Sequence, residues 1–107
     1  MRYIFSVIHD RSNSGTPEEM QRIHAFNEKL IAGGHRILAE GVSDPSEALV
    51  IDNRNGHATI TTGPLIDTKE FMSGLWIIEA ADDIEAKNLA IEASLACNRK
   101  IEVRRFL

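Results

Sequence analysis

Two segments of the chain are apolar on both faces of the strand that each would form. Residues 2–9 read RYIFSVIH, where strict alternation places Tyr3, Phe5 and Val7 on one face and Ile4 and Ile8 on the other. Residues 74–80, GLWIIEA, repeat the pattern. A strand of this kind needs cover on both sides, so both segments are predicted to be central strands of one sheet.

A helix signal follows each of these strands. In the first helix Thr16 is the predicted N-cap, Pro17 takes the first helical position and Glu19 closes a capping box. Gly33 and Gly34 supply the residues that end it. Its apolar stripe is predicted to be Met20, Ile23, Phe26, Leu30 and Ile31.

The second helix is predicted over residues 82–97. Asp82 and Asp83 stand where carboxylates cap a helix and complement its dipole. Its buried positions are predicted to be Ala86, Leu89, Ala90, Ala93 and Cys97.

Three further strand patterns complete the chain. Residues 35–41 and 100–107 each read as a single strand, and residues 47–62 read as two strands around Asn55-Gly56. Asn-Gly favours a tight hairpin because both turn positions tolerate positive φ. A hairpin is therefore expected in the middle of the sequence.

This order of elements predicts an α+β fold: a ferredoxin-like sandwich with an antiparallel sheet and two helices on one face, built as one domain over residues 1–107. The helices cover one face only, although both central strands are apolar on both. A second copy of the chain is the simplest cover for the other face, so a homodimer is expected.

Charge and composition narrow the partners. The net charge is −4, and the basic residues form no run longer than an adjacent pair such as Arg104 and Arg105, which argues against binding nucleic acid. No run approaches the roughly 20 apolar residues of a membrane helix, so we expect a cytoplasmic protein without a membrane partner. The single cysteine, Cys97, fits a reducing compartment and is interpreted as a packing residue.

One irregular segment, residues 61–80, carries a family resemblance. TTGPLIDTKEFMSGLWIIEA resembles the signature of the DGPF branch of the YCII-related proteins, with Gly63, Pro64, Lys69, Glu70 and Gly74 at the matching places. HAFNEKLIAGG, AEG at residues 39–41 and IEVRRFL extend the likeness over nearly the whole chain. The resemblance implies a ferredoxin-like fold that dimerises as a dimeric α/β-barrel, with a cleft at or near the dimer interface.

The chain also departs from that pattern. Thr62 and Leu65 stand where the signature has Asp and Phe, so an acid–base role of that Asp does not carry over. Some YCII-related proteins are thought to use a His-Asp pair near the first helix. Here His24 is displaced by one residue and Ala32 lies near the place of the Asp, so the pair is not evident.

The candidate site residues cluster on loops and strand ends. Lys69 and Glu70 are the foremost candidates, because a lysine beside a carboxylate can hold an anionic group or tune a general base; the alternative is a surface ion pair. His9 is a candidate proton carrier. The remaining candidate ligand-binding residues are Glu40, Gly63, Pro64 and Asp67, of which the last three also suit a turn.

Two functions remain open from the sequence. One is a protein that binds a small polar or acidic molecule near a dimer interface. The other is a cofactor-free lyase or isomerase that moves protons on a small organic acid or aromatic substrate. No cofactor is predicted because P-loop, Rossmann and CxxC patterns do not occur, and no metal is predicted because the four histidines form no ligand pair.

Overall fold

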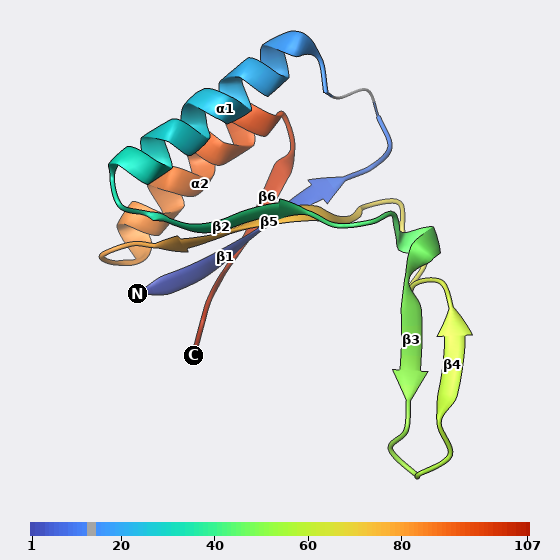
Figure 1. Cartoon of the computed structure of the whole chain (residues 1–107). Coiled ribbons are helices and arrows are strands. Elements are labelled where there is room, and N and C mark those ends of the chain that lie inside the picture. The colour runs from blue at the N-terminus through green and yellow to red at the C-terminus, as the bar shows by residue number, and fades with distance from the viewer. Residues whose placement is uncertain (13–14) are drawn as a thin grey trace.

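A four-stranded antiparallel sheet carries the fold of the computed structural model, which describes residues 1–12 and 15–107. The elements in chain order are β1 (Arg2–His9), α1 (Pro17–Ala32), β2 (Arg36–Gly41), a short 3₁₀ turn (Pro45–Glu47), β3 (Leu49–Asp52), β4 (Thr59–Thr62), β5 (Phe71–Glu79), α2 (Asp83–Cys97) and β6 (Lys100–Arg105). The sheet order is β2-β5-β1-β6, and both helices lie on one face (Figure 1). This is the predicted ferredoxin-like arrangement, with β1 and β5 in the centre.

Both helices begin as their capping residues predict. The hydroxyl of Thr16 accepts a hydrogen bond from the N–H of Glu19 at 3.1 Å, and Asp82 accepts one from the N–H of Glu85 at 2.9 Å. The carboxylate of Glu19 turns back to the N–H of Gly15 at 2.8 Å. Side chains therefore satisfy amide groups that would otherwise be unpaired at each helix start.

The core lies between the helices and the inner face of the sheet. Its largest fully buried side chains are Tyr3, Phe5, Leu30 and Ile78. All five positions predicted for α2 are buried, but α1 buries only the middle of its predicted stripe, since Met20 and Ile31 are more than half exposed. Their neighbours Glu19 and Leu30 are buried, so Met20 and Ile31 are exposed because they lie on the outward flank of the helix, not because its ends lack cover.

The predicted hairpin is present, but its turn is wider than predicted. Asp52 pairs with Thr59, which leaves six residues in the connection, and only Gly56 of the Asn-Gly pair takes a positive φ, +80°. The hairpin also forms a separate two-stranded sheet that projects from the domain (Figure 1). The local signal located the hairpin correctly, whereas its turn type and its isolation from the main sheet were not predicted.

The strand predicted from residue 74 begins earlier, at Phe71. The end of the irregular loop therefore forms the first residues of β5. Gly74 pairs with Gly41 of β2, and a Cβ at Gly74 would lie 3.0 Å from the carbonyl oxygen of Glu40. Glycine therefore permits the close approach of β2 and β5 that the sequence suggested at this position.

Neither helix covers the other face of the sheet (Figure 1). Cross-strand pairing places Ile4, Ile77 and Leu38 together on it, and Ile8 pairs there with Lys100 of β6. We call this the open face.

In the part of the chain that the structure describes, neither helix is long and apolar enough to cross a membrane.

Tyr3, the chain's single tyrosine, gives the fold a spectroscopic test. Its hydroxyl donates to Asp83 Oδ1 at 2.7 Å, and burial, followed by this bond, raises the pKa of Tyr3 from 10.0 to about 12. An acid with a raised pKa keeps its proton longer in the folded state. The contribution of Tyr3 to the free energy of unfolding should therefore be fully present below pH 10 and should be lost as the pH rises from 10 to about 12.

We expect the phenolate absorbance of the folded protein to appear with a midpoint near pH 12. Replacing Asp83 with Asn should move that midpoint down, because the charge of Asp83 contributes to the shift. A midpoint near 10 in the folded wild-type protein would contradict the buried, bonded placement of Tyr3.

Candidate functional site

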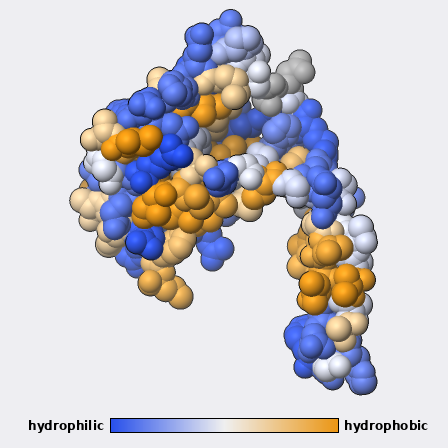
Figure 2. Space-filling view, viewed as in Figure 1, coloured by the Kyte–Doolittle hydropathy of each residue, from blue (hydrophilic) through white to orange (hydrophobic). Residues whose placement is uncertain are grey.

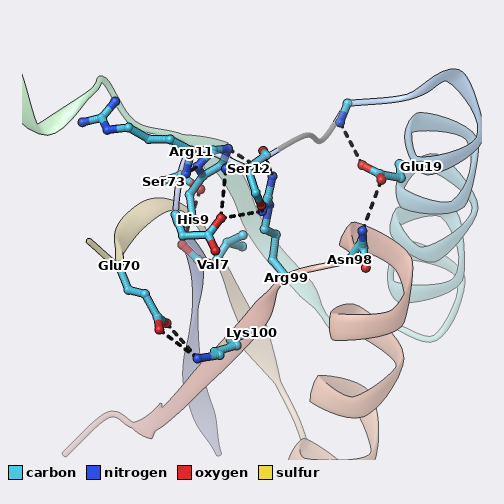
Figure 3. A network of polar contacts seen from close by, with 12 residues as sticks. Val7, His9, Arg11, Ser12, Glu19, Glu70, Ser73, Asn98, Arg99 and Lys100 are labelled. Atoms are coloured by element: carbon cyan, nitrogen blue, oxygen red, sulfur yellow. Dashed lines mark hydrogen bonds and ion pairs between the residues drawn. The ribbon is translucent and has the colours of Figure 1, made fainter. Parts of the chain in front are cut away.

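Arg99 organises a polar cluster where β1 ends and α2 passes into β6. Its side chain is only 8% exposed. One guanidinium nitrogen lies 2.9 Å from the Ser12 hydroxyl and 3.3 Å from Asp10 Oδ1, and the other donates to the Ser12 carbonyl oxygen at 2.9 Å. Figure 3 shows Arg99 spanning from α2 to this loop. A buried cation thus fixes the segment that leaves β1.

A cavity of about 420 Å³ opens beside Arg99. It is lined by Ile8, Asp10, Ser12, Glu70, Ser94, Asn98, Arg99 and Lys100. We call it the polar cavity, and its volume lies in the range of small-molecule sites. Two cations and two carboxylates lie along its wall.

Lys100 and Glu70 form the exposed part of this wall. Lys100 Nζ lies 2.9 Å and 3.0 Å from the two carboxylate oxygens of Glu70, with the two side chains 75% and 46% exposed (Figure 3). The hydrogen bond to Glu70 is the main cause that raises the pKa of Lys100. An ion pair this exposed contributes little to stability, so its partners can be exchanged.

Asp10 lies close to the cations Arg99, Lys69 and Lys100. Hydrogen bonds from Ser12 are the main cause that lowers its pKa, and the charges of Arg99 and Lys69 lower it further. The Asp10 carboxylate therefore stays ionised well into the acid range.

His9 lies at the edge of the cluster, stacked on Phe71 with ring centroids 5.7 Å apart. The N–H of Arg11 donates to His9 Nδ1 at 2.6 Å, and a guanidinium nitrogen of Arg99 lies 3.2 Å from Nε2. Both ring nitrogens thus face groups of the protein that carry N–H donors.

Arg11 forms a second ion pair next to His9. Its guanidinium binds Asp44 through two contacts, at 2.5 Å and 3.2 Å, and lies 4.7 Å from the centre of the Phe71 ring. The bond from Arg11 holds the pKa of Asp44 well below its ordinary value, and Asp67 adds to the raised pKa of Arg11. This contact ties the segment after β2 to the end of β1.

A second cavity, of about 320 Å³, lies between α1 and the sheet and has a more apolar lining. Trp76, predicted to be a packing residue, is 5% exposed in its wall, and its indole N–H donates to Asn27 Oδ1 at 2.9 Å. Phe26 meets the same ring edge-on at 5.3 Å. Because the polar tip of Trp76 is satisfied, this cavity offers mainly apolar contacts.

The fold brings several predicted site residues to the end of β1. His9 contacts Arg99, and Glu70 lines the polar cavity. Lys69 lies close enough to lower the pKa of Asp10, and Asp67 lies close enough to raise that of Arg11. The ion pair of Glu70 is made with Lys100 of β6, not with its sequence neighbour Lys69.

The other predicted residues lie apart. Gly63 and Pro64 follow the hairpin, where Gly63 takes φ +104° and its N–H donates to Ala48 at 2.7 Å. Glu40 is on β2 beside the second cavity, and its pairing with Leu75 places its side chain on the open face.

The sequence reasoning missed Arg99, Lys100, Arg11 and Asp44. Arg99 and Lys100 follow the predicted α2, at the start of a strand, so a cation pair at a helix–strand junction was the available signal. Their partners lie about 30 to 90 positions away in the sequence, so only the tertiary fold identifies them.

The described residues give little support to metal binding or to a reactive thiol. Among residues 1–12 and 15–107 no group of three His, Cys, Asp or Glu side chains is placed to hold a metal ion. Cys97 is buried, and burial raises the pKa of its thiol, which disfavours the reactive thiolate.

Comparison with known proteins was made by family and by individual sequence. The family model described as the YCII-related domain matches residues 1–106. Among curated proteins no match was found. The family match covers nearly every residue of the domain described above, and it shows that the chain belongs to the YCII-related family.

Proposed function

We propose that this protein binds a small polar or acidic molecule in the polar cavity, close to the interface of a homodimer. The observation that carries the proposal is the adjacent pair Arg99 and Lys100, two cations on the wall of one cavity. Arg99 is buried and fixed, whereas Lys100 is exposed and held by a single carboxylate. A fixed donor beside an exchangeable one is suited to an anionic ligand.

The charges of the cavity favour a small acid over a multiply charged anion. Asp10 and Glu70 balance Arg99 and Lys100, so the wall has no net excess of positive charge. A ligand carboxylate can take the place of Glu70 on Lys100 at low cost, because that ion pair is exposed. The Asp10 carboxylate on the same wall can accept a hydrogen bond from an amino group of the same molecule.

The proposed homodimer follows from the open face. Ile8 and Lys100 pair across β1 and β6 on that face and also line the polar cavity. Packing the open faces of two copies would bury the outer side of both central strands. The cavity would then lie at the rim of the interface.

The surroundings of His9 favour binding over proton transfer by this residue. A general base needs a ring nitrogen directed at the substrate. Both nitrogens of His9 instead face N–H groups, those of Arg11 and Arg99. The lyase or isomerase alternative would require His9 to exchange these contacts for substrate.

A thermal-shift titration with small mono- and dicarboxylic acids and amino acids tests the proposal. Replacing Lys100 with Gln should weaken binding about tenfold, the effect of one charge-assisted contact. Replacing Glu70 with Gln should strengthen binding, because Lys100 is then released for the ligand. Lys29→Gln is the matched control, since Lys29 is an exposed lysine paired with Glu92 on the helices, away from the cavity.

If acids stabilise the wild-type protein and the Lys100→Gln variant equally, the polar cavity is not the site. If no member of the panel raises the melting temperature, the proposed ligand class is wrong.

A further inference from the structure

We propose that the hairpin and the loop after it, residues 49–66, form an arm that clasps a second copy of this chain. The inference rests on the homodimer proposed above but assigns a separate surface to it. Figure 1 shows β3 and β4 leaving the domain on the side of the sheet opposite to the helices. The arm therefore extends toward the space that a partner on the open face would occupy.

One face of the arm is apolar and exposed. The register pairs Ile51 with Ile60 and Leu49 with Thr62, so these side chains share a face, whereas Thr61 and Val50 lie on the other. Leu49, Ile51 and Ile60 are 60%, 65% and 64% exposed. Figure 2 shows this apolar patch on the part of the arm nearer the domain, whereas the tip is hydrophilic. The following loop adds Leu65 and Ile66, at 78% and 69% exposure.

A hairpin this short gains little stability by itself. Each strand has four residues, and an isolated two-stranded hairpin is marginal in water unless an apolar face is packed. The whole chain is also extended for its length, with a radius of gyration of 15.9 Å against about 13 Å for a compact domain of this size. Both observations point to a surface that is packed in the assembled protein.

The exposed area favours a second copy as the occupant. Five leucine and isoleucine side chains present a patch on the order of 500 Å², at the upper end of what monomers expose. In a two-fold dimer each subunit gives one arm and receives one. Each subunit then buries its own arm and the surface that receives the partner's arm, so the arm alone supplies the larger part of the about 800 Å² per partner of a stable interface.

The length of the arm is also sufficient. From residue 48 to the turn at residue 55 the extended chain spans on the order of 20 Å. Two sheets packed face to face lie about 10 Å apart, so the arm reaches past the partner's sheet. It can therefore grip the side of the partner subunit.

Sedimentation equilibrium of three single variants, two of them on β4 and one on β3, tests the clasp. Ile60→Asp puts a charge on the apolar face of the arm and should raise the dimer dissociation constant about 100-fold, the effect of losing a buried anchor. Thr61→Asp puts the same charge one residue along, on the opposite face, and should leave the constant within about threefold. Leu49→Ser, a milder change on the apolar face, should weaken the dimer by an intermediate factor.

Hydrogen exchange of residues 49–52 and 59–62 gives a second readout. These amides should be protected in the dimer and should exchange rapidly on dilution, while the β1 and β5 amides stay protected. Equal dimerisation of Ile60→Asp and wild type overturns the clasp. A wild-type chain that is monomeric at micromolar concentration overturns the clasp and the homodimer together, whereas ligand binding in the polar cavity is judged by the thermal-shift titration alone.

Discussion

Replacing Arg99 with Gln is expected to abolish the binding of small acids and to lower the melting temperature by about 10 °C. The shorter neutral side chain loses the contacts to Asp10 and Ser12, and hydrogen bonds to a charged group contribute about 2 kcal/mol in such a setting. In a domain of this size that loss corresponds to roughly 10 °C. Differential scanning calorimetry of the variant and the wild type, each with and without the acid, measures both effects.

Arg99→Lys should not restore either property. A lysine carries the charge but cannot reach Asp10, the Ser12 hydroxyl and the Ser12 carbonyl with one planar group. Arg22→Gln removes an exposed arginine from α1 and serves as the control. A variant at position 99 that melts like the wild type would show that the guanidinium does not fix the end of β1.

Replacing Gly74 with Val is expected to destabilise the fold by about 2 to 3 kcal/mol. The new Cβ would lie 3.0 Å from the carbonyl oxygen of Glu40 and 3.4 Å from the Cα of Gly41, and both are backbone atoms that cannot rotate away. β2 and β5 must then separate, a strain typical of overpacked sites. Chemical denaturation measures the free energy of unfolding.

Gly41→Val is the matched control, because Gly41 is the cross-strand partner of Gly74 and its Cβ would meet the Ser73 carbonyl oxygen at an ordinary 3.7 Å. It should cost less than about 1 kcal/mol, within the range of a tolerated exchange. Equal losses of unfolding free energy at the two positions would mean that the close approach of β2 and β5 does not depend on the glycine at position 74.

The architecture was predictable because its signals are local. The doubly apolar segments identified β1 and β5 as central strands, and side-chain caps at Thr16 and Asp82 set the helix starts. The likeness of residues 61–80 to the DGPF signature led to the YCII-related family, which the match over residues 1–106 shows.

The site was only partly predictable, because its contacts are long-range. Lys69 and Glu70 were read as a pair from their adjacency, but the carboxylate of Glu70 binds Lys100. Arg99 drew no attention in the sequence, although burial against Asp10 and Ser12 makes it the centre of the cluster. The hairpin shows the same limit, since Asn55-Gly56 indicates a turn and cannot indicate that the arm leaves the sheet.

Chemical-shift mapping of a titration with a small carboxylic acid tests the central claim most directly. The account predicts saturable shifts of the Arg99 guanidinium signal and of the amides of Asp10, Ser12, Asn98 and Lys100, with the indole N–H of Trp76 unmoved. Trp76 is the chain's single tryptophan, and its indole N–H reports on the second cavity. Shifts centred on Trp76 and Asn27, with the Arg99 signal unchanged, would contradict the account.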